Sequence, residues 1–253
     1  MKETWNEVYG KRLAGMWYPD EGVVRFVARY LSRRVGVDSY EKRRLTESIL
    51  DAGCGLGRHV VFLAEQGFNV YGIDQSEHAL QMAETWLAKR GLRAGLSIGD
   101  VTRLPFRDKS FDVAISCGVM DHMKPKQTSG AIEEISRILT DGGYLYVTLR
   151  SMEDCEYGRG ENVARNTFLL QDGYERGLVQ HFFTWEEISE LLSGFRVFDV
   201  ECHDERFPSS FGIDKSFVQS TTGFKGHIDS SNLNLDLRYS RWHIAAEKAV
   251  TNS

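Results

Sequence analysis

The sequence predicts a doubly wound α/β fold, in which helices cover both faces of a mostly parallel β-sheet. Two observations support this prediction. Between residues 48 and 150, short apolar segments alternate with segments of helical periodicity, and such alternation places successive strands side by side and parallel. The first of these strands also ends in a glycine-rich loop that opens a helix, an arrangement typical of this class.

The individual elements follow from periodicity and from helix caps. We expect strands over residues 48–52, 69–73, 96–98, 111–117, 144–149, 196–202 and 239–247. We expect helices over residues 58–66, 76–90, 131–139 and 184–193. Ser76 is placed to cap the second of these helices and Gly91 to end it, while Thr184 and Glu187 form a capping box for the fourth.

A further helix is predicted before the core, over residues 21–34, because its apolar residues recur at helical spacing. Arg25, Arg29 and Arg33 follow one another at four-residue steps along another face of this helix. This stripe is either a solvated face or a contact for an acidic or phosphate-bearing substrate.

Two long segments, 151–183 and 203–237, show little regular periodicity and are expected to be loop-like. Loops of this length within a compact domain are usually functional or mobile. The 253 residues suffice for one large domain, or for one domain with a sizeable insertion.

Composition and charge exclude several classes of protein. The formal net charge of −5 gives no general attraction to nucleic acid or to an anionic membrane surface. The four cysteines are scattered and form no CxxC pair, so neither a metal site nor a disulfide scaffold is expected. We find no secretory signal and no apolar run long enough to span a membrane, and therefore expect a cytoplasmic protein.

The glycine loop carries the strongest chemical signal. Asp51 precedes three glycines at alternate positions, Gly53, Gly55 and Gly57, whereas a dinucleotide site has the pattern GxGxxG. Glycine lets the backbone approach a ligand closely and adopt positive φ. An aspartate beside a diphosphate would be repelled, whereas beside an ammonium group it is stabilising. The loop therefore favours a ligand with an amino-acid end.

Two further acids follow at the ends of the next predicted strands. Asp74 is placed to accept both hydroxyls of a ribose, as acids at this position do in dinucleotide folds. Asp100 can accept from the exocyclic amine of an adenine, and the backbone N–H of Val101 can donate to a ring nitrogen. Either aspartate alone could be a turn or N-cap residue. In this order, they indicate a nucleoside that carries an amino-acid tail.

With these motifs the chain resembles the class I S-adenosylmethionine-dependent methyltransferases. The resemblance rests on ILDAGCGLGRHVVFLAEQG, VYGIDQSEHALQMA, GDVTRLPFRDKSFDVAISCGVMDHM and ILTDGGYLYVTL. It implies a seven-stranded sheet of the Rossmann-like methyltransferase type with an antiparallel last strand and inserted loops. It also implies one domain over residues 1–253, made of a cap (1–47), a cofactor-binding core (48–150) and a region with the substrate loop and last strands (151–253).

The resemblance also assigns roles to residues around S-adenosylmethionine. Cofactor-binding residues would be Tyr9, Asp51, Gly53, Gly55, Gly57, Asp74, Gln75, Asp100, Val101 and Cys117. Trp5 resembles the aromatic lead-in that often covers the cofactor. Because residues 117–123 lack the Asp/Asn-Pro-Pro-aromatic motif of enzymes that methylate DNA amines, we expect a small-molecule acceptor and no nucleic acid.

Methyl transfer requires alignment of the acceptor and exclusion of water, with a base only for a protonated acceptor. His122 and His181 are the candidate catalytic bases, since imidazole titrates near neutral pH. Either could instead be a packing histidine. Tyr157 and Arg159 could contact the substrate or lie in a solvated loop.

Three other functions compete with a small-molecule methyltransferase. A nicotinamide-dependent oxidoreductase would need GxGxxG, which the spacing contradicts. A non-catalytic module would bind S-adenosylmethionine but have a blocked acceptor pocket. A methyltransferase that acts on tRNA or protein would use the basic stretch from Arg25 to Arg44. The sequence does not identify the acceptor atom or the oligomeric state.

Overall fold

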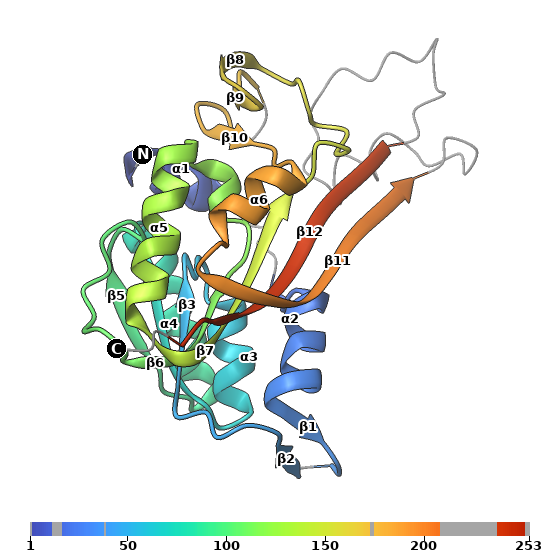
Figure 1. Ribbon diagram of the computed structural model, residues 1–253. Helices are drawn as coiled ribbons and strands as arrows, with labels where there is room; N and C mark the ends of the chain where they lie inside the picture. The colour runs from blue at the N-terminus through green and yellow to red at the C-terminus, as the bar shows by residue number, and fades with distance from the viewer. Residues whose placement is uncertain (1, 12–16, 38, 173–174, 208–236, 251–253) are drawn as a thin grey trace.

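The computed structural model describes residues 2–11, 17–37, 39–172, 175–207 and 237–250. Its main feature is a seven-stranded sheet with the order β11-β12-β7-β6-β3-β4-β5 (Figure 1). These strands are β3 (Ser48–Ala52), β4 (Asn69–Asp74), β5 (Gly95–Ile98), β6 (Phe111–Ser116), β7 (Leu139–Arg150), β11 (Phe195–Phe207) and β12 (Leu237–Lys248). The five from β3 to β7 are parallel, and β12 pairs antiparallel with both β7 and β11. The predicted doubly wound sheet with an antiparallel last strand is confirmed.

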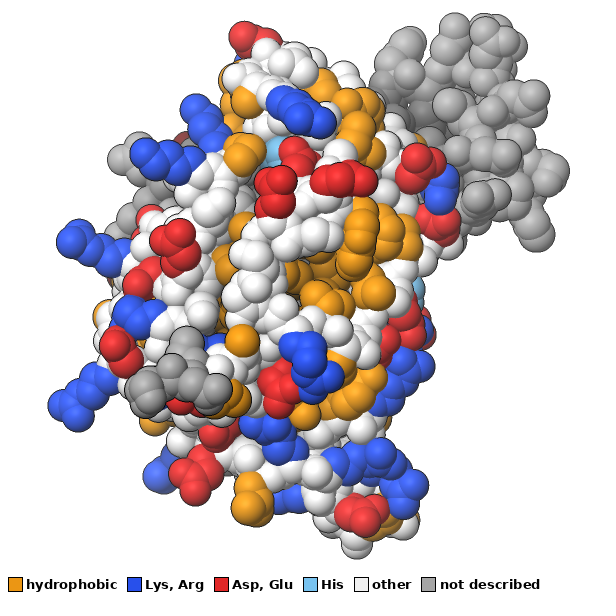
Figure 2. Space-filling view, in the orientation of Figure 1, with side chains coloured by type: hydrophobic (Ala, Val, Ile, Leu, Met, Phe, Trp, Pro, Cys, Tyr) orange, Lys and Arg blue, Asp and Glu red, His pale blue; other side chains and the backbone are white. Residues whose placement is uncertain are grey.

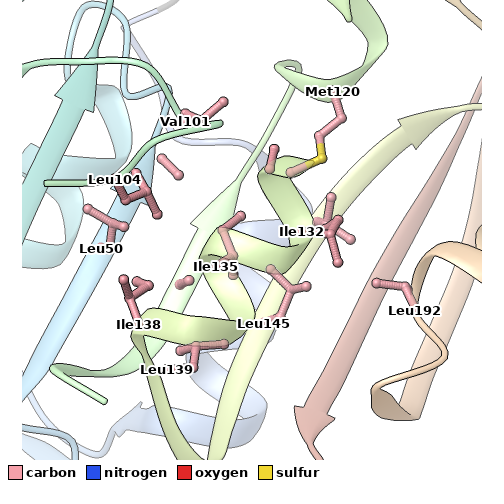
Figure 3. Packing of buried hydrophobic residues seen from close by; sticks show 14 of the residues in the cluster. Leu50, Val101, Leu104, Met120, Ile132, Ile135, Ile138, Leu139, Leu145 and Leu192 are labelled. Carbon is pink, nitrogen blue, oxygen red and sulfur yellow. The ribbon is translucent and has the colours of Figure 1, made fainter. Parts of the chain in front are cut away.

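Helices cover both faces of this sheet. One face packs against α2 (Glu21–Phe26), α3 (Arg58–Glu65) and α4 (Glu77–Arg90), and the other against α5 (Pro125–Ile138) and α6 (Trp185–Leu191). Each face of the sheet therefore has its own apolar core, the first under α2, α3 and α4 and the second under α5 and α6. Successive side chains of β3 point to opposite faces, so Ile49 lies in the first core and Leu50 in the second. Figure 3 shows the second core, where Ile132 and Ile135 of α5 face the sheet.

The predicted caps of α4 and α6 are confirmed. The Ser76 hydroxyl accepts a hydrogen bond from the backbone N–H of Ala79 at 3.2 Å, and Gly91 ends α4 in the left-handed region with φ 65°. At α6, the Thr184 hydroxyl and the Glu187 carboxylate each accept from the other's backbone N–H, as in a capping box. These local bonds fix both helix starts.

The helix predicted over residues 131–139 begins six residues earlier than expected, at Pro125, and ends at Ile138. Proline suits the first helical turn, where its missing N–H costs no hydrogen bond. The Gln127 side chain also accepts from the backbone N–H of Lys124 at 3.2 Å. Leu139 already belongs to β7, so that strand starts before residue 144.

The helix predicted over residues 21–34 also ends early. After α2 the chain makes one π-helical turn (Val27–Leu31), and β1 (Ser32–Arg34) then pairs antiparallel with β2 (Tyr40–Lys42). The arginine stripe forms ion pairs within the chain. Arg25 and Arg29 contact acidic residues of β11, and Arg33 contacts Glu41. The stripe is therefore paired with acidic side chains, while Arg29 and Arg33 stay about half exposed.

The expectation that residues 151–183 are loop-like is wrong in part. They contain a three-stranded antiparallel sheet, β8 (Glu161–Ala164), β9 (Thr167–Leu169) and β10 (Val179–His181). Its strands are too short to show a period of two clearly, and Asn166 turns the first hairpin with φ 52°. Of the predicted 203–237 excursion, residues 203–207 extend β11 and residue 237 begins β12, while the rest lies outside the described residues.

Among the described residues, no helix is long and apolar enough to cross a membrane. In the same part of the chain, no group of three or more His, Cys, Asp or Glu residues could hold a metal ion. Burial instead concentrates in the two apolar cores on either side of the sheet.

Candidate active site

A pocket of about 80 Å³, partly open to solvent, lies beside the carboxyl ends of β3, β4 and β6. Here the chain order reverses, because β3 is flanked by β4 on one side and by β6 on the other. Ligands of doubly wound folds bind at such switch points. Its lining comprises Trp5, Tyr9, Gly53, Asp74, Gln75, Gly99, Asp100, Val101, Cys117, Gly118, Val119, His122, Met123 and Gln127.

Eight of the residues singled out for cofactor or catalysis therefore meet in one place, although they come from α1 (Lys2–Lys11) and from five separate loops or strand ends. The eight are Tyr9, Gly53, Asp74, Gln75, Asp100, Val101, Cys117 and His122. Sequence reasoning did not single out Met123 and Gln127. Pro125, as a residue typical of a first helical turn, could have indicated that Gln127 lies at the start of α5.

The glycine loop has the conformation that the sequence suggested. Gly53, Gly55 and Gly57 have φ values of 82°, 51° and 83°. A Cβ atom on Gly53 would lie 2.3 Å from Val119, and one on Gly55 would lie 2.6 Å from the Tyr9 hydroxyl. Both the backbone angle and the space therefore require glycine here. Gly55 and Gly57 shape the loop from behind and do not line the pocket.

Asp74 is held in a fixed orientation at the pocket wall. Its two carboxylate oxygens accept hydrogen bonds of 2.8 Å from the backbone N–H groups of Gly55 and Ser76. Burial raises the pKa of this carboxyl group, and the backbone N–H donors oppose that rise. Each oxygen retains a second lone pair, so the group can still accept from two neighbouring hydroxyls.

Asp51 lies at the end of β3, almost fully buried and outside the pocket lining. Its Oδ2 atom has no hydrogen-bond partner among the described residues. Burial raises the pKa of Asp51 to about 7; the nearby Arg58 lowers it, and Asp74 raises it further. A buried carboxylate oxygen without a partner suits a cationic ligand group. This unpaired acceptor fits the ammonium group of an amino-acid end.

Asp100 is both a turn residue and a pocket residue. Its Oδ1 atom accepts from the backbone N–H of Thr102 at 2.9 Å and from the Thr102 hydroxyl at 2.8 Å. Val101, next along the chain, is buried and also lines the pocket. The turn therefore orients the segment that would face an adenine.

His122 lies in a 3₁₀ turn (Met120–His122) just after β6. Its Nδ1 atom is 3.2 Å from the carbonyl oxygen of Val179 in β10, and its Nε2 atom is 3.9 Å from Oε1 of Glu175. The Trp5 ring meets the imidazole edge-on, with centroids 5.1 Å apart. The imidazole is thus fixed by the small sheet on one side and by α1 on the other.

The preceding residue anchors this turn. The buried Asp121 accepts hydrogen bonds of 2.7 Å from the backbone N–H of Arg150 and from the Arg241 guanidinium. These donors come from β7 and β12. Two strands of the main sheet therefore hold the turn that presents His122.

The structure does not bring His181 to the pocket lining. It is buried in β10, where its Nδ1 atom is 2.7 Å from the Thr167 hydroxyl, and burial lowers its pKa. Tyr157 donates to the Asn166 side chain, and Arg159 pairs with Asp172. His181, Tyr157 and Arg159 therefore all have partners within the 151–183 segment.

Comparison with known proteins agrees with this geometry. Residues 49–143 match the family model described as a methyltransferase domain. A protein of Encephalitozoon cuniculi that is named as a methyltransferase is 31% identical over 179 residues, covering 67% of this chain and 79% of that one. Human EEF1A lysine methyltransferase 2 is 29% identical over 156 residues, covering 58% of this chain and 66% of that one.

Solved structures show the same relationship. A structure of an S-adenosylmethionine-dependent methyltransferase from Methanosarcina mazei superimposes with a TM-score of 0.63 at 25% identity. The match covers 82% of this chain and 94% of that one. The chain belongs to the class I S-adenosylmethionine-dependent methyltransferase family, and S-adenosylmethionine is its cofactor.

Proposed function

We propose that the protein transfers the methyl group of S-adenosylmethionine to an oxygen or nitrogen atom of a small molecule. The observation that carries this proposal is the pocket, which α1 covers with the stacked rings of Trp5 and Tyr9 (centroids 5.7 Å apart). Aromatic rings over this pocket would shield the transferred methyl group and a compact acceptor from water. Lys and Arg side chains are interspersed with Asp and Glu on the face shown in Figure 2, which does not favour a nucleic-acid footprint.

The cofactor would lie along the carboxyl ends of the strands. Asp74 would accept from the ribose hydroxyls, beside Gln75, and Asp100 with Val101 would hold the adenine. Gly53 and the buried Asp51 would take the amino-acid end, and Cys117 would line the floor. Bound in this way, S-adenosylmethionine supplies an electrophilic methyl group on a sulfonium.

His122 would serve as the general base for a hydroxyl or ammonium acceptor. The Val179 carbonyl can only accept, so the 3.2 Å contact requires the imidazole proton on Nδ1 and leaves a lone pair on Nε2. For a hydroxyl, Nε2 would take the proton as the oxygen bonds to the methyl carbon; for an ammonium, it would take the proton before the nitrogen bonds. In both cases the methyl–sulfur bond would break and S-adenosylhomocysteine would leave. The imidazolium that results would be stabilised by Glu175, 3.9 Å from Nε2. Trp5 and Met123 would exclude water from this end of the pocket.

Relatives of this chain are named for a small-molecule, a protein and a tRNA acceptor, so the acceptor class needs a direct test. The protein would be incubated with S-adenosylmethionine labelled on the methyl group and with a cell extract, which is then separated into metabolite, protein and RNA fractions. We expect label in the metabolite fraction. Label confined to protein or RNA would contradict the proposal, as would binding of cofactor without label in any fraction.

A further inference from the structure

His59 is a buried histidine that the proposed chemistry does not use. It stands in the first turn of α3, directly after the glycine loop, and it is almost fully buried. Its two ring nitrogens face two different acidic residues. The Nε2 atom is 3.2 Å from the backbone N–H of Asp20, and the Nδ1 atom is 3.8 Å from Oδ2 of Asp51.

The hydrogen bond from Asp20 determines the tautomer of this imidazole. A backbone N–H can only donate, so Nε2 must accept and the ring proton must be on Nδ1. Burial and the nearby Arg58 lower the pKa of His59, which favours the neutral ring. The nitrogen that carries the proton is the one that faces Asp51.

The facing oxygen is the one that lacks a partner. Oδ2 of Asp51 forms no hydrogen bond among the described residues, and 3.8 Å to Nδ1 is longer than a hydrogen bond. The contact at 3.8 Å is therefore electrostatic, and a hydrogen bond requires one of the two side chains to turn. Arg58 and Asp74 are the charged groups that act on Asp51, and Asp20 and Arg58 act on His59.

We propose that His59 is a positioning residue for the cofactor, whose Nδ1–H orients the Asp51 carboxylate so that it receives the ammonium group of the amino-acid end. Asp20 fixes the imidazole in this tautomer through its backbone, and its carboxylate caps α2 by accepting from Gly22 at 2.9 Å. The start of α2 is thereby connected to the amino-acid end of the cofactor site. This inference rests on the proposed placement of that end against Asp51.

Two substitutions of His59 separate its two hydrogen-bonding functions. In His59→Asn, the side-chain amide can replace the Nδ1–H donor toward Asp51 and loses the acceptor for Asp20. In His59→Gln, the longer side chain can replace the Nε2 acceptor and loses the donor toward Asp51. If His59 orients Asp51, His59→Gln should bind the cofactor more weakly than His59→Asn. If His59 only anchors Asp20, His59→Asn should be the weaker binder.

The readout is calorimetric affinity for S-adenosylhomocysteine and for 5′-methylthioadenosine, which lacks the amino-acid end. We expect His59→Gln to bind S-adenosylhomocysteine roughly tenfold more weakly than the parent, the loss expected for one hydrogen bond to a charged group. His59→Asn should stay within about threefold of the parent. Both variants should bind 5′-methylthioadenosine as the parent does, because this ligand does not contact Asp51.

Three outcomes would overturn the inference. His59→Gln could match the parent, His59→Asn could be the weaker binder, or both ligands could lose affinity equally, which indicates a purely structural role. The Asp51→Asn variant shows whether only the role of His59 is wrong or whether the amino-acid end of the cofactor does not lie against Asp51. If Asp51→Asn also leaves S-adenosylhomocysteine affinity unchanged, the amino-acid end does not lie against Asp51; if it weakens binding, only the role of His59 is wrong.

Discussion

Burial of the Asp51 carboxyl group lowers the stability of the fold at neutral and higher pH. It is buried without a hydrogen-bond partner for Oδ2 among the described residues, and burial raises its pKa from 3.8 to about 7. The folded protein thus binds this proton more tightly than the unfolded chain does. The contribution of Asp51 to the free energy of unfolding therefore falls as pH rises from about 4 to about 7, and the full cost remains above that range.

Asp51→Asn should remove this cost. We expect the variant without ligand to melt at a higher temperature than the parent at pH 8, with a gap that narrows toward pH 5, because the parent carboxyl is then protonated as well. Differential scanning calorimetry at the two pH values measures this gap. Asp108→Asn is the matched control, since Asp108 is exposed and pairs with Arg137, and its loss should not stabilise the fold. An Asp51→Asn variant that is less stable than the parent at pH 8 would contradict the account.

His122 is the residue on which the proposed chemistry depends. With Nδ1 bonded to Val179, His122→Ala removes the base and should lower kcat by about 10²- to 10⁴-fold for a protonated acceptor. The Kd for S-adenosylhomocysteine should change little. His78→Ala is a suitable control, because His78 is exposed on α4. A loss of kcat below tenfold would show that alignment alone supplies the acceleration and that His122 is not a base.

Among the helices and strands, α1 is the one whose mobility a bound ligand should change most, because it covers the pocket. Its Trp5 and Tyr9 line the pocket, and its Asn6 side chain accepts from the Ser76 hydroxyl at 2.7 Å, at the cap of α4. Hydrogen exchange in residues 2–11 should therefore slow when S-adenosylhomocysteine is added. Residues 185–191 of α6 do not line this pocket and serve as the internal reference. Equal exchange in α1 with and without ligand would show that it is not a lid.

The elements predicted well from the sequence are those whose ends are marked by capping residues or by glycines. Ser76 and Gly91 bound α4, and the glycine loop bounds β3, so these elements match within a residue or so. Errors arose where pairing and packing, rather than a local sequence pattern, decide the structure. The strands of the small sheet β8–β10 are three or four residues long, and their pairing with one another stabilises them.

The same distinction applies to the site. Asp74 and Asp100 could be placed from strand ends, because parallel strands align their carboxyl ends in any doubly wound sheet. His122 and His181 could not be distinguished in sequence, since both follow apolar segments. The contact between His122 and Val179 spans 57 residues and depends on how β10 packs against the turn after β6.

For the whole molecule, two cores on opposite faces of one sheet carry the stability, and the pocket lies at the edge between them. The pocket can therefore keep buried acids and left-handed glycines that the cores would not tolerate. Proteins commonly place strained or costly groups at functional sites and compensate elsewhere. The doubly wound topology explains why residues between 53 and 127 meet in one pocket, which α1 covers with Trp5 and Tyr9.

Isothermal titration calorimetry with S-adenosylhomocysteine, on the parent and on Asp74→Asn, tests the central claim most directly. Asp74→Asn keeps one side-chain oxygen that can accept from the backbone N–H of Gly55 or Ser76, but it removes the charge that would bind the ribose hydroxyls. For the parent we expect one S-adenosylhomocysteine site per chain with a micromolar Kd, and no heat of binding with NAD. In Asp74→Asn the binding free energy for S-adenosylhomocysteine should fall by about 1.5 kcal/mol or more, which weakens the Kd roughly tenfold. Tight binding of NAD without S-adenosylhomocysteine, or equal affinity in parent and variant, would contradict the account.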